Sequence, residues 1–156
     1  MPHLPTHKVL LKLAKSAAKK IDLNTPSNLS KIDFEKIDEN LTPNMRALRL
    51  TMSIADQLFS MGVAASDVVH SALAITNTYC KRPVHIDISY TLLTISQDRG
   101  INKEPLTMIR TVTTRTTNYQ TIQSLQELAK MIRSRQITLS DAEKQLKKIL
   151  ESSKSY

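Results

Sequence analysis

The chain has 156 residues, of which 40% are apolar and 4% aromatic, so it fits one ordinary domain with a core of aliphatic side chains. Its 22 Lys and Arg against 14 Asp and Glu give a formal net charge of +8, which attracts nucleic acid or an anionic bilayer. Nucleic-acid binding is disfavoured, because the sequence shows neither basic residues interleaved with aromatic ones nor a recognisable motif for reading bases.

The single cysteine limits the chemistry of the chain. Cys80 excludes an internal disulfide and cannot by itself form a zinc site, so we expect no metal and no other cofactor. The first residues lack the apolar segment of a secretory signal, and no run of roughly 18 apolar residues could cross a bilayer. The composition therefore predicts a domain in a reducing compartment with no membrane span of its own.

Residues 1–21 predict a basic amphipathic helix. Apolar residues recur at helical spacing from Val9 to Ile21, and Lys8, Lys12 and Lys15 lie largely on the other side. Such a helix can lie on anionic lipid through residues 8–21, or it can pack on its own domain with a solvated lysine face. Residues 22–42 are interpreted as a linker.

Two helices are expected next. Thr42 followed by Pro43 is a favourable helix start, and the apolar stripe that follows predicts a helix from Pro43 to Ser60. Gly62 stands where a left-handed residue commonly ends a helix. A second helix with a broad apolar face follows, includes His70 and a buried Cys80, and ends at Lys81-Arg82-Pro83.

After the second helix, the apolar residues no longer recur at helical spacing but at every second position. Residues 84–90 alternate apolar and polar side chains, 91–97 continue the alternation, and 106–113 are rich in strand-forming residues. These segments predict an antiparallel sheet of two to three strands.

Two further helices are expected at the end of the chain. One spans residues 118–135, and the second begins at a capping box in which Ser140 and Glu143 satisfy free backbone amides. The whole pattern predicts an α+β fold with about four main helices on a small sheet, as one domain over residues 43–152, with a polar tail at 153–156.

His85, Asp87 and Ser89 form the most enzyme-like cluster. Alternate positions place the three side chains on one face of a strand, about 7 Å from one to the next. A histidine and a carboxylate there could serve as an acid–base pair of a hydrolase or as two metal ligands, whereas the simpler interpretation is the solvated face of an amphipathic strand. Phosphate-binding glycine loops are excluded, because they need several close glycines and the chain has only two.

Three arginines are candidates for an anion or carboxylate site. Arg99, Arg110 and Arg115 each offer a planar fork of donors that matches a carboxylate. The structural alternative is that they are solvated cations.

Several segments, in order, resemble the soluble N-terminal domain of the threonine/serine exporter family. They are the residues Gly-Val-Ala-Ala-Ser-Asp-Val at 62–68, Val-His-Ile-Asp-Ile-Ser-Tyr-Thr at 84–91, Thr-Ile-Ser-Gln-Asp-Arg-Gly at 94–100 and Glu-Pro-Leu-Thr-Met-Ile-Arg at 104–110. The resemblance continues through Asn118-Tyr119 and the last two helices, and covers roughly residues 48–149.

The resemblance implies a domain that precedes a bundle of membrane helices and lies on the cytoplasmic side of the cell membrane. Such proteins export threonine and serine using the proton-motive force, and this domain would regulate, gate or assemble the transporter. The implied partner is the membrane-spanning half, in cis or as a separate subunit, and homo-oligomerisation is left open. The residues at recurring motif positions of the family are Gly62, Asp67, His85, Asp87, Arg99, Gly100 and Arg110, while Asn118 stands where many members carry an acidic residue. Among them we take Arg99, Arg110 and Asp67 as ligand-binding candidates, and Gly62 and Gly100 as structural.

Overall fold

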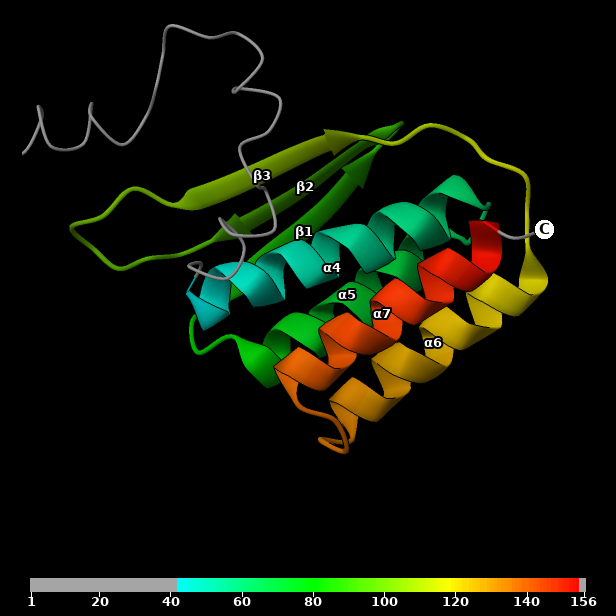
Figure 1. The fold of residues 1–156 in the computed structure, drawn as a ribbon. Coiled ribbons are helices and arrows are strands. Elements are labelled where there is room, and N and C mark those ends of the chain that lie inside the picture. The colour runs from blue at the N-terminus through cyan, green and yellow to red at the C-terminus, as the bar shows by residue number, and fades with distance from the viewer. Residues whose placement is uncertain (1–41, 155–156) are drawn as a thin grey trace, which may run out of the picture. The chain divides into compact units, whose positions relative to one another are not determined.

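A computed structural model describes residues 42–154, which form one α+β unit (Figure 1). In chain order the elements are α4 (Pro43–Ser60), α5 (Ala65–Tyr79), β1 (Val84–Ser89), β2 (Leu92–Gln97), β3 (Leu106–Thr111), α6 (Tyr119–Arg133) and α7 (Leu139–Lys154). The predicted fold class is confirmed. The basic helix predicted for residues 1–21, and the linker predicted for 22–42 apart from Thr42, lie outside the described residues.

Helix α4 begins and ends as the sequence predicts. The Thr42 hydroxyl accepts a hydrogen bond from the Met45 amide at 3.3 Å, and Pro43 occupies the first turn, where its missing N–H costs nothing. At the other end Gly62 adopts φ of 93°, and the Gly62 and Val63 amides donate to the carbonyls of Phe59 and Leu58. This pair of bonds is a Schellman motif, which a left-handed glycine makes favourable.

Helix α5 starts three residues later. Asp67 lies in its first turn, where a carboxylate is favoured by the helix dipole. The prediction that Cys80 belongs to this helix and is buried is wrong in detail. The last helical residue is Tyr79, and Cys80 follows with extended backbone and a half-buried side chain, because Lys81, Arg82 and Pro83 already lead the chain into β1.

The three strands form an antiparallel sheet in the order β1-β2-β3, so β1 and β3 are both edge strands. In the register, Ile86 faces Ile95 and Ile95 faces Met108, which places these side chains on the inner face. The two-residue turn between β1 and β2 contains Tyr90, whose φ of 56° is uncommon for a residue with a side chain. The outer face consists of alternate residues in the same register: His85, Asp87, Ser89, Leu92, Thr94, Ser96, Thr107, Ile109 and Thr111.

Helices α6 and α7 complete the domain. The Asn118 side chain caps α6 by accepting hydrogen bonds from the Gln120 and Thr121 amides, so an uncharged side chain serves there as a cap. The capping box predicted at Ser140 and Glu143 is wrong. Helix α7 begins two residues earlier, and Thr138 Oγ1 accepts a hydrogen bond from the Asp141 amide at 3.3 Å.

The two residues of the predicted capping box instead bind an arginine of α4. Arg46 makes a salt bridge with the Glu143 carboxylate and donates to Ser140 Oγ at 3.2 Å. A contact between segments almost a hundred residues apart therefore replaces a local cap, since Thr138 already satisfies the helix start.

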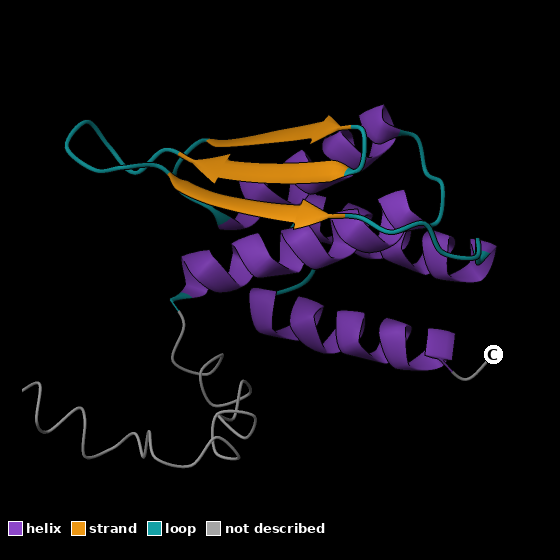
Figure 2. Ribbon diagram, turned by 90° about the horizontal axis from the view of Figure 1, so that it is seen from above, coloured by secondary structure: helices purple, strands orange, loops and turns teal. Residues whose placement is uncertain are grey.

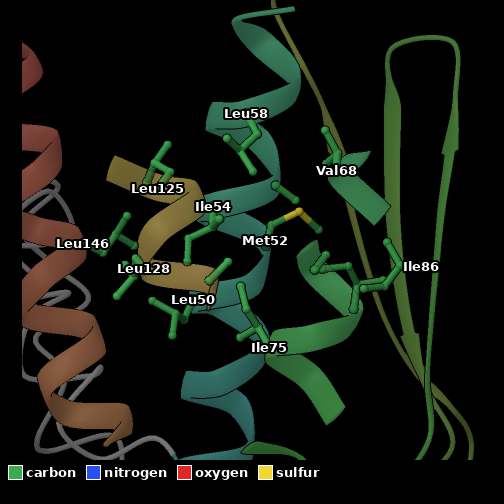
Figure 3. Close-up of a cluster of buried hydrophobic side chains, with 14 of the residues drawn as sticks. Leu50, Met52, Ile54, Leu58, Val68, Ile75, Ile86, Leu125, Leu128 and Leu146 are labelled. Carbon is green, nitrogen blue, oxygen red and sulfur yellow. The ribbon is translucent and has the colours of Figure 1, made fainter. Parts of the chain in front are cut away.

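The core lies between the sheet and the helices. Figures 1 and 2 show the inner face of the sheet against α4 and α5, with α6 and α7 on the opposite side of these two helices. Figure 3 shows buried side chains from all these layers in contact around α4, including Leu50, Met52, Ile54, Ile75, Ile86, Leu128 and Leu146. Within residues 42–154, no helix combines the length and the apolar character needed to cross a bilayer.

Candidate functional site

The outer face of the sheet carries the predicted cluster of His85, Asp87 and Ser89. All three side chains are exposed on edge strand β1, and across the ladder His85 faces Ser96 and Asp87 faces Thr94. The neighbouring side chains are thus hydroxyls, and Ser96 is bonded to Thr107 at 3.1 Å. Among the described residues, no group of three His, Cys, Asp or Glu side chains could hold a metal ion. The face is an open polar surface, and no further titratable group lies across the ladder from His85 or Asp87.

Two of the ligand-binding candidates lie away from this face. Arg110 belongs to the inner register of β3 and makes a salt bridge of 3.1 Å with Asp56 of α4. This pair fastens the edge strand to the helix beneath it. Asp67 is exposed in the first turn of α5, and Arg115 is exposed in the connection after β3, where its backbone amide donates to the Ser60 carbonyl. The structure therefore does not bring Arg110, Arg115 and Asp67 to one site.

The third candidate, Arg99, lines a hollow at one end of the sheet, and we call this feature the basic hollow. Its volume is about 480 Å³. Three segments meet there: the first turn of α4, the connection between α5 and β1, and the loop between β2 and β3. The lining residues are Thr42, Pro43, Asn44, Met45, Tyr79, Lys81, Arg82, Gln97, Arg99, Lys103 and Leu106.

The charged side chains that line the basic hollow are all cationic. Lys81, Arg82, Arg99 and Lys103 contribute four positive charges, and none of the lining residues that the structure describes is a carboxylate. Within residues 42–154, none of the four takes part in a salt bridge. The amino-terminal end of α4 also lines the hollow and adds the positive end of an 18-residue helix dipole. The hollow is therefore a region of concentrated positive potential.

Gly100 lies where the two connecting segments approach each other, and its backbone conformation favours a glycine. Its φ is 108°, and a Cβ at this position would lie 3.4 Å from Nη1 of Arg82. The Gly100 amide donates to Asp98 Oδ1 at 2.9 Å, and the Asp98 amide donates to the Pro83 carbonyl at 3.2 Å. The glycine thus allows the left-handed turn, and a Cβ there would make an ordinary van der Waals contact with the Arg82 guanidinium.

A pair of side-chain amides joins β2 to α4 beside the hollow. Asn44 Nδ2 donates to Gln97 Oε1 at 2.7 Å, and Gln97 Nε2 donates to Asn44 Oδ1 at 2.8 Å. Each amide oxygen therefore accepts a hydrogen bond from the other residue's nitrogen, while each nitrogen keeps a second N–H. The hollow thus offers donors and cations, and its two amide acceptors are already paired.

Tyr79 closes another side of the hollow. Its hydroxyl donates to the Ile137 carbonyl at 2.8 Å, and burial, followed by the nearby Asp141 carboxylate, raises the pKa of this phenol. The tyrosine stays protonated and ties the end of α5 to the connection before α7, which fixes one wall of the hollow.

Of the four cations of the hollow, only Arg99 was a candidate from the sequence. In the sequence, Lys81 and Arg82 only mark the end of a helix, and Lys103 lies in a polar loop. The proximity of Lys81-Arg82 to Arg99-Gly100 depends on the antiparallel pairing of β1 with β2, which brings the start of one strand beside the end of the other. The sequence predicts both strands, so an assumed antiparallel pairing could have indicated that these cations lie close together.

Comparisons with known proteins point to one family. A family model described as "Putative threonine/serine exporter" matches residues 49–156. The chain is also similar to a "Probable threonine/serine exporter" of Mycobacterium tuberculosis (strain ATCC 25618 / H37Rv), with 27% identity over 111 residues. The aligned region covers 71% of this chain and 21% of that relative, so the chain spans about a fifth of the length of the protein it matches. No solved structure matches the chain.

Proposed function

The chain belongs to the threonine/serine exporter family, and we propose that it acts as a domain outside the bilayer, on the cytoplasmic side, that regulates, gates or assembles a transporter of small amino acids. The observation that carries this proposal is the family match, which runs from within α4 to the end of the chain. It thus takes in nearly all of the described fold.

The length of the matched relative supports a partner. This chain corresponds to 21% of that protein, so we propose that a membrane-spanning half, in cis or as a separate subunit, supplies the route for the cargo. A route through lipid requires spanning helices or a barrel, because backbone groups must be satisfied inside the segment that crosses. The net charge of +8 supports the cytoplasmic side, where the inner leaflet attracts basic domains.

The outer face of the sheet is where we propose contact with that half. Ile109 is 62% exposed and Leu92 39% exposed on this face, and Tyr90, at the tip of the β1–β2 turn, is 95% exposed. Exposed apolar side chains on a face that no described helix covers support burial against another protein surface. Both edge strands also leave backbone groups available for pairing.

Reconstituted export tests the proposal. A membrane-spanning protein of the same family from the same genome is produced in cells lacking their own exporters, with and without this chain, and the efflux of preloaded threonine and serine is measured. We expect efflux to depend on the chain and to fall several-fold for the double variant Leu92→Ser/Ile109→Ser. The control Ser96→Ala/Thr107→Ala changes two polar residues of the same face. Efflux that is equal with and without the chain rejects the proposal.

The alternative function, a hydrolase or metal-dependent enzyme that uses His85 and Asp87, gains no support from the geometry. A working base needs a nucleophile within hydrogen-bond reach and a group that orients it. Asp87 lies two residues along the same strand from His85, and the residues across the ladder are Thr94 and Ser96. The hypothesis predicts ester or amide hydrolysis that His85→Ala abolishes, and activity unchanged by that substitution rejects it.

A further inference from the structure

The basic hollow has the composition of an anion site. We propose that it binds a phosphate-bearing anion of small-molecule size through Lys81, Arg82, Arg99 and Lys103. The inference concerns the domain by itself and holds whether or not the chain takes part in transport.

The first argument is charge. Four cations from two connections line one volume of about 480 Å³, and no carboxylate of residues 42–154 lines it. Since like charges repel, such an arrangement is unfavourable without a counter-charge. The loop between β2 and β3 holds two carboxylates, Asp98 and Glu104, and neither lines the hollow. Asp98 accepts a hydrogen bond from the Gly100 amide, and this bond shapes the turn. A multivalent anion is the missing counter-charge.

The second argument is the arrangement of donors. The first turn of α4 lines the hollow, and the positive end of its helix dipole favours an anion there. Its amides contribute less, because Pro43 has no N–H and the Met45 amide already donates to Thr42. Two guanidinium groups add planar forks that match phosphate oxygens, and two ammonium groups add point charges. Phosphate provides acceptors in several directions, so it can use donors that come from three walls.

The third argument excludes a free amino acid as the occupant. Threonine and serine carry one carboxylate and one ammonium group, so a site for them needs an acceptor for the ammonium. The side-chain oxygens of Asn44 and Gln97 each accept a hydrogen bond from the amide nitrogen of the other residue, and the charged side chains among the described lining residues are all cationic. The hollow would repel the ammonium group, and it is therefore suited to a regulatory anion and not to the exported amino acid.

Phosphate can come from a dissolved molecule or from a lipid headgroup. The experiment uses the full chain and two probes: inorganic pyrophosphate in calorimetric titration, and vesicles of phosphatidylcholine with or without phosphatidic acid in a sedimentation assay. The test variant is Lys81→Gln/Lys103→Gln. The matched control is Lys144→Gln/Lys147→Gln, which removes two exposed lysines of α7 and gives the same net charge.

We expect the test variant to bind the effective probe at least about tenfold more weakly, because each charge-assisted contact at a partly exposed site contributes a few-fold. The control should stay within about twofold of the unaltered chain, and affinity should fall between about 50 and 300 mM KCl through screening. Pyrophosphate binding with this pattern supports the proposal and identifies a dissolved phosphate compound. The same pattern seen only with phosphatidic acid vesicles supports it and identifies the lipid headgroup.

Three results overturn the proposal. They are the absence of binding to both probes, equal weakening in the test and control variants, and binding of L-threonine that the test variant abolishes. Thermal unfolding of both variants shows whether the fold is retained. If the test variant fails to fold, Arg99→Gln, a single change in the exposed loop, replaces it and is expected to weaken binding several-fold.

Discussion

The amide pair of Asn44 and Gln97 allows a quantitative test of how β2 is held to α4. The substitution Asn44→Leu removes both hydrogen bonds, of 2.7 and 2.8 Å, while keeping a side chain of similar size. Gln97 is only 2% exposed, so water cannot easily replace the lost partner. An unsatisfied buried amide costs about 1–3 kcal/mol.

We therefore expect Asn44→Leu to lower the free energy of unfolding by about 2 kcal/mol. For a domain of this size, that change lowers the melting temperature by roughly 5–10 °C. Gln97→Met alone should also destabilise, because it leaves the half-buried Asn44 amide without its partner. The double variant should be less destabilised than the sum of the single variants by about 1–2 kcal/mol, since no orphaned amide remains.

Urea unfolding followed by circular dichroism measures all three variants. The control is Asn77→Leu, which changes an exposed asparagine of α5 and should alter stability by no more than about 0.5 kcal/mol. Two results refute the reasoning: Asn44→Leu within about 0.5 kcal/mol of the unaltered chain, or single effects that simply add.

Four further substitutions or treatments test individual features. Gly62→Ala should lower stability by about 1–2 kcal/mol in urea unfolding, because φ is 93° and a Cβ would meet no non-neighbouring atom closer than 3.9 Å, so only backbone strain acts. Tyr90→Gly should raise stability by up to about 1 kcal/mol, since it relieves φ of 56° at an exposed residue, and a loss of stability would contradict this. Burial raises the pKa of the Cys80 thiol, so iodoacetamide should react with it more slowly at about pH 7.5 in the folded chain than in the urea-unfolded chain, and equal rates would refute this. The pKa of Tyr79 is raised in the folded state, so the stabilisation that its protonated phenol provides is present below the unfolded pKa of about 10 and is lost as pH rises through the folded pKa. The variant Tyr79→Phe should remove that alkaline loss of stability, which is measured as melting temperature against pH.

The fold was predictable where local signals agree with long-range packing. Thr42 and Pro43 at the start of α4 and the glycine at its end fix the helix, and the structure ends it at Ser60 as the pattern predicts. The start of α7 was misassigned because Ser140 and Glu143 match a capping box in sequence alone. Their actual partner, Arg46, lies far away in the chain, and no local pattern contains that information.

The candidate site was only partly predictable for the same reason. The alternation of β1 correctly places His85, Asp87 and Ser89 together on an exposed face. In contrast, Lys81 and Lys103 are separated by more than twenty residues, and they line one hollow only because β2 returns beside β1 and the following loop folds back. A site made of connections depends on the register of the sheet, which the sequence indicates only in outline.

The contrast between the two groups of charged residues argues for a role of the hollow. Arg46 is paired with Glu143 and Arg110 with Asp56, so this fold supplies carboxylates where an arginine joins two elements. At the basic hollow, none of the described lining residues is a carboxylate. Positive charge without a partner lowers stability by self-repulsion, and a ligand that binds only the folded state raises stability with the logarithm of its concentration once that exceeds the dissociation constant. Because the first turn of α4 and the loop before β3 both line the hollow, an anion held there would couple the stability of these two segments to the supply of that anion.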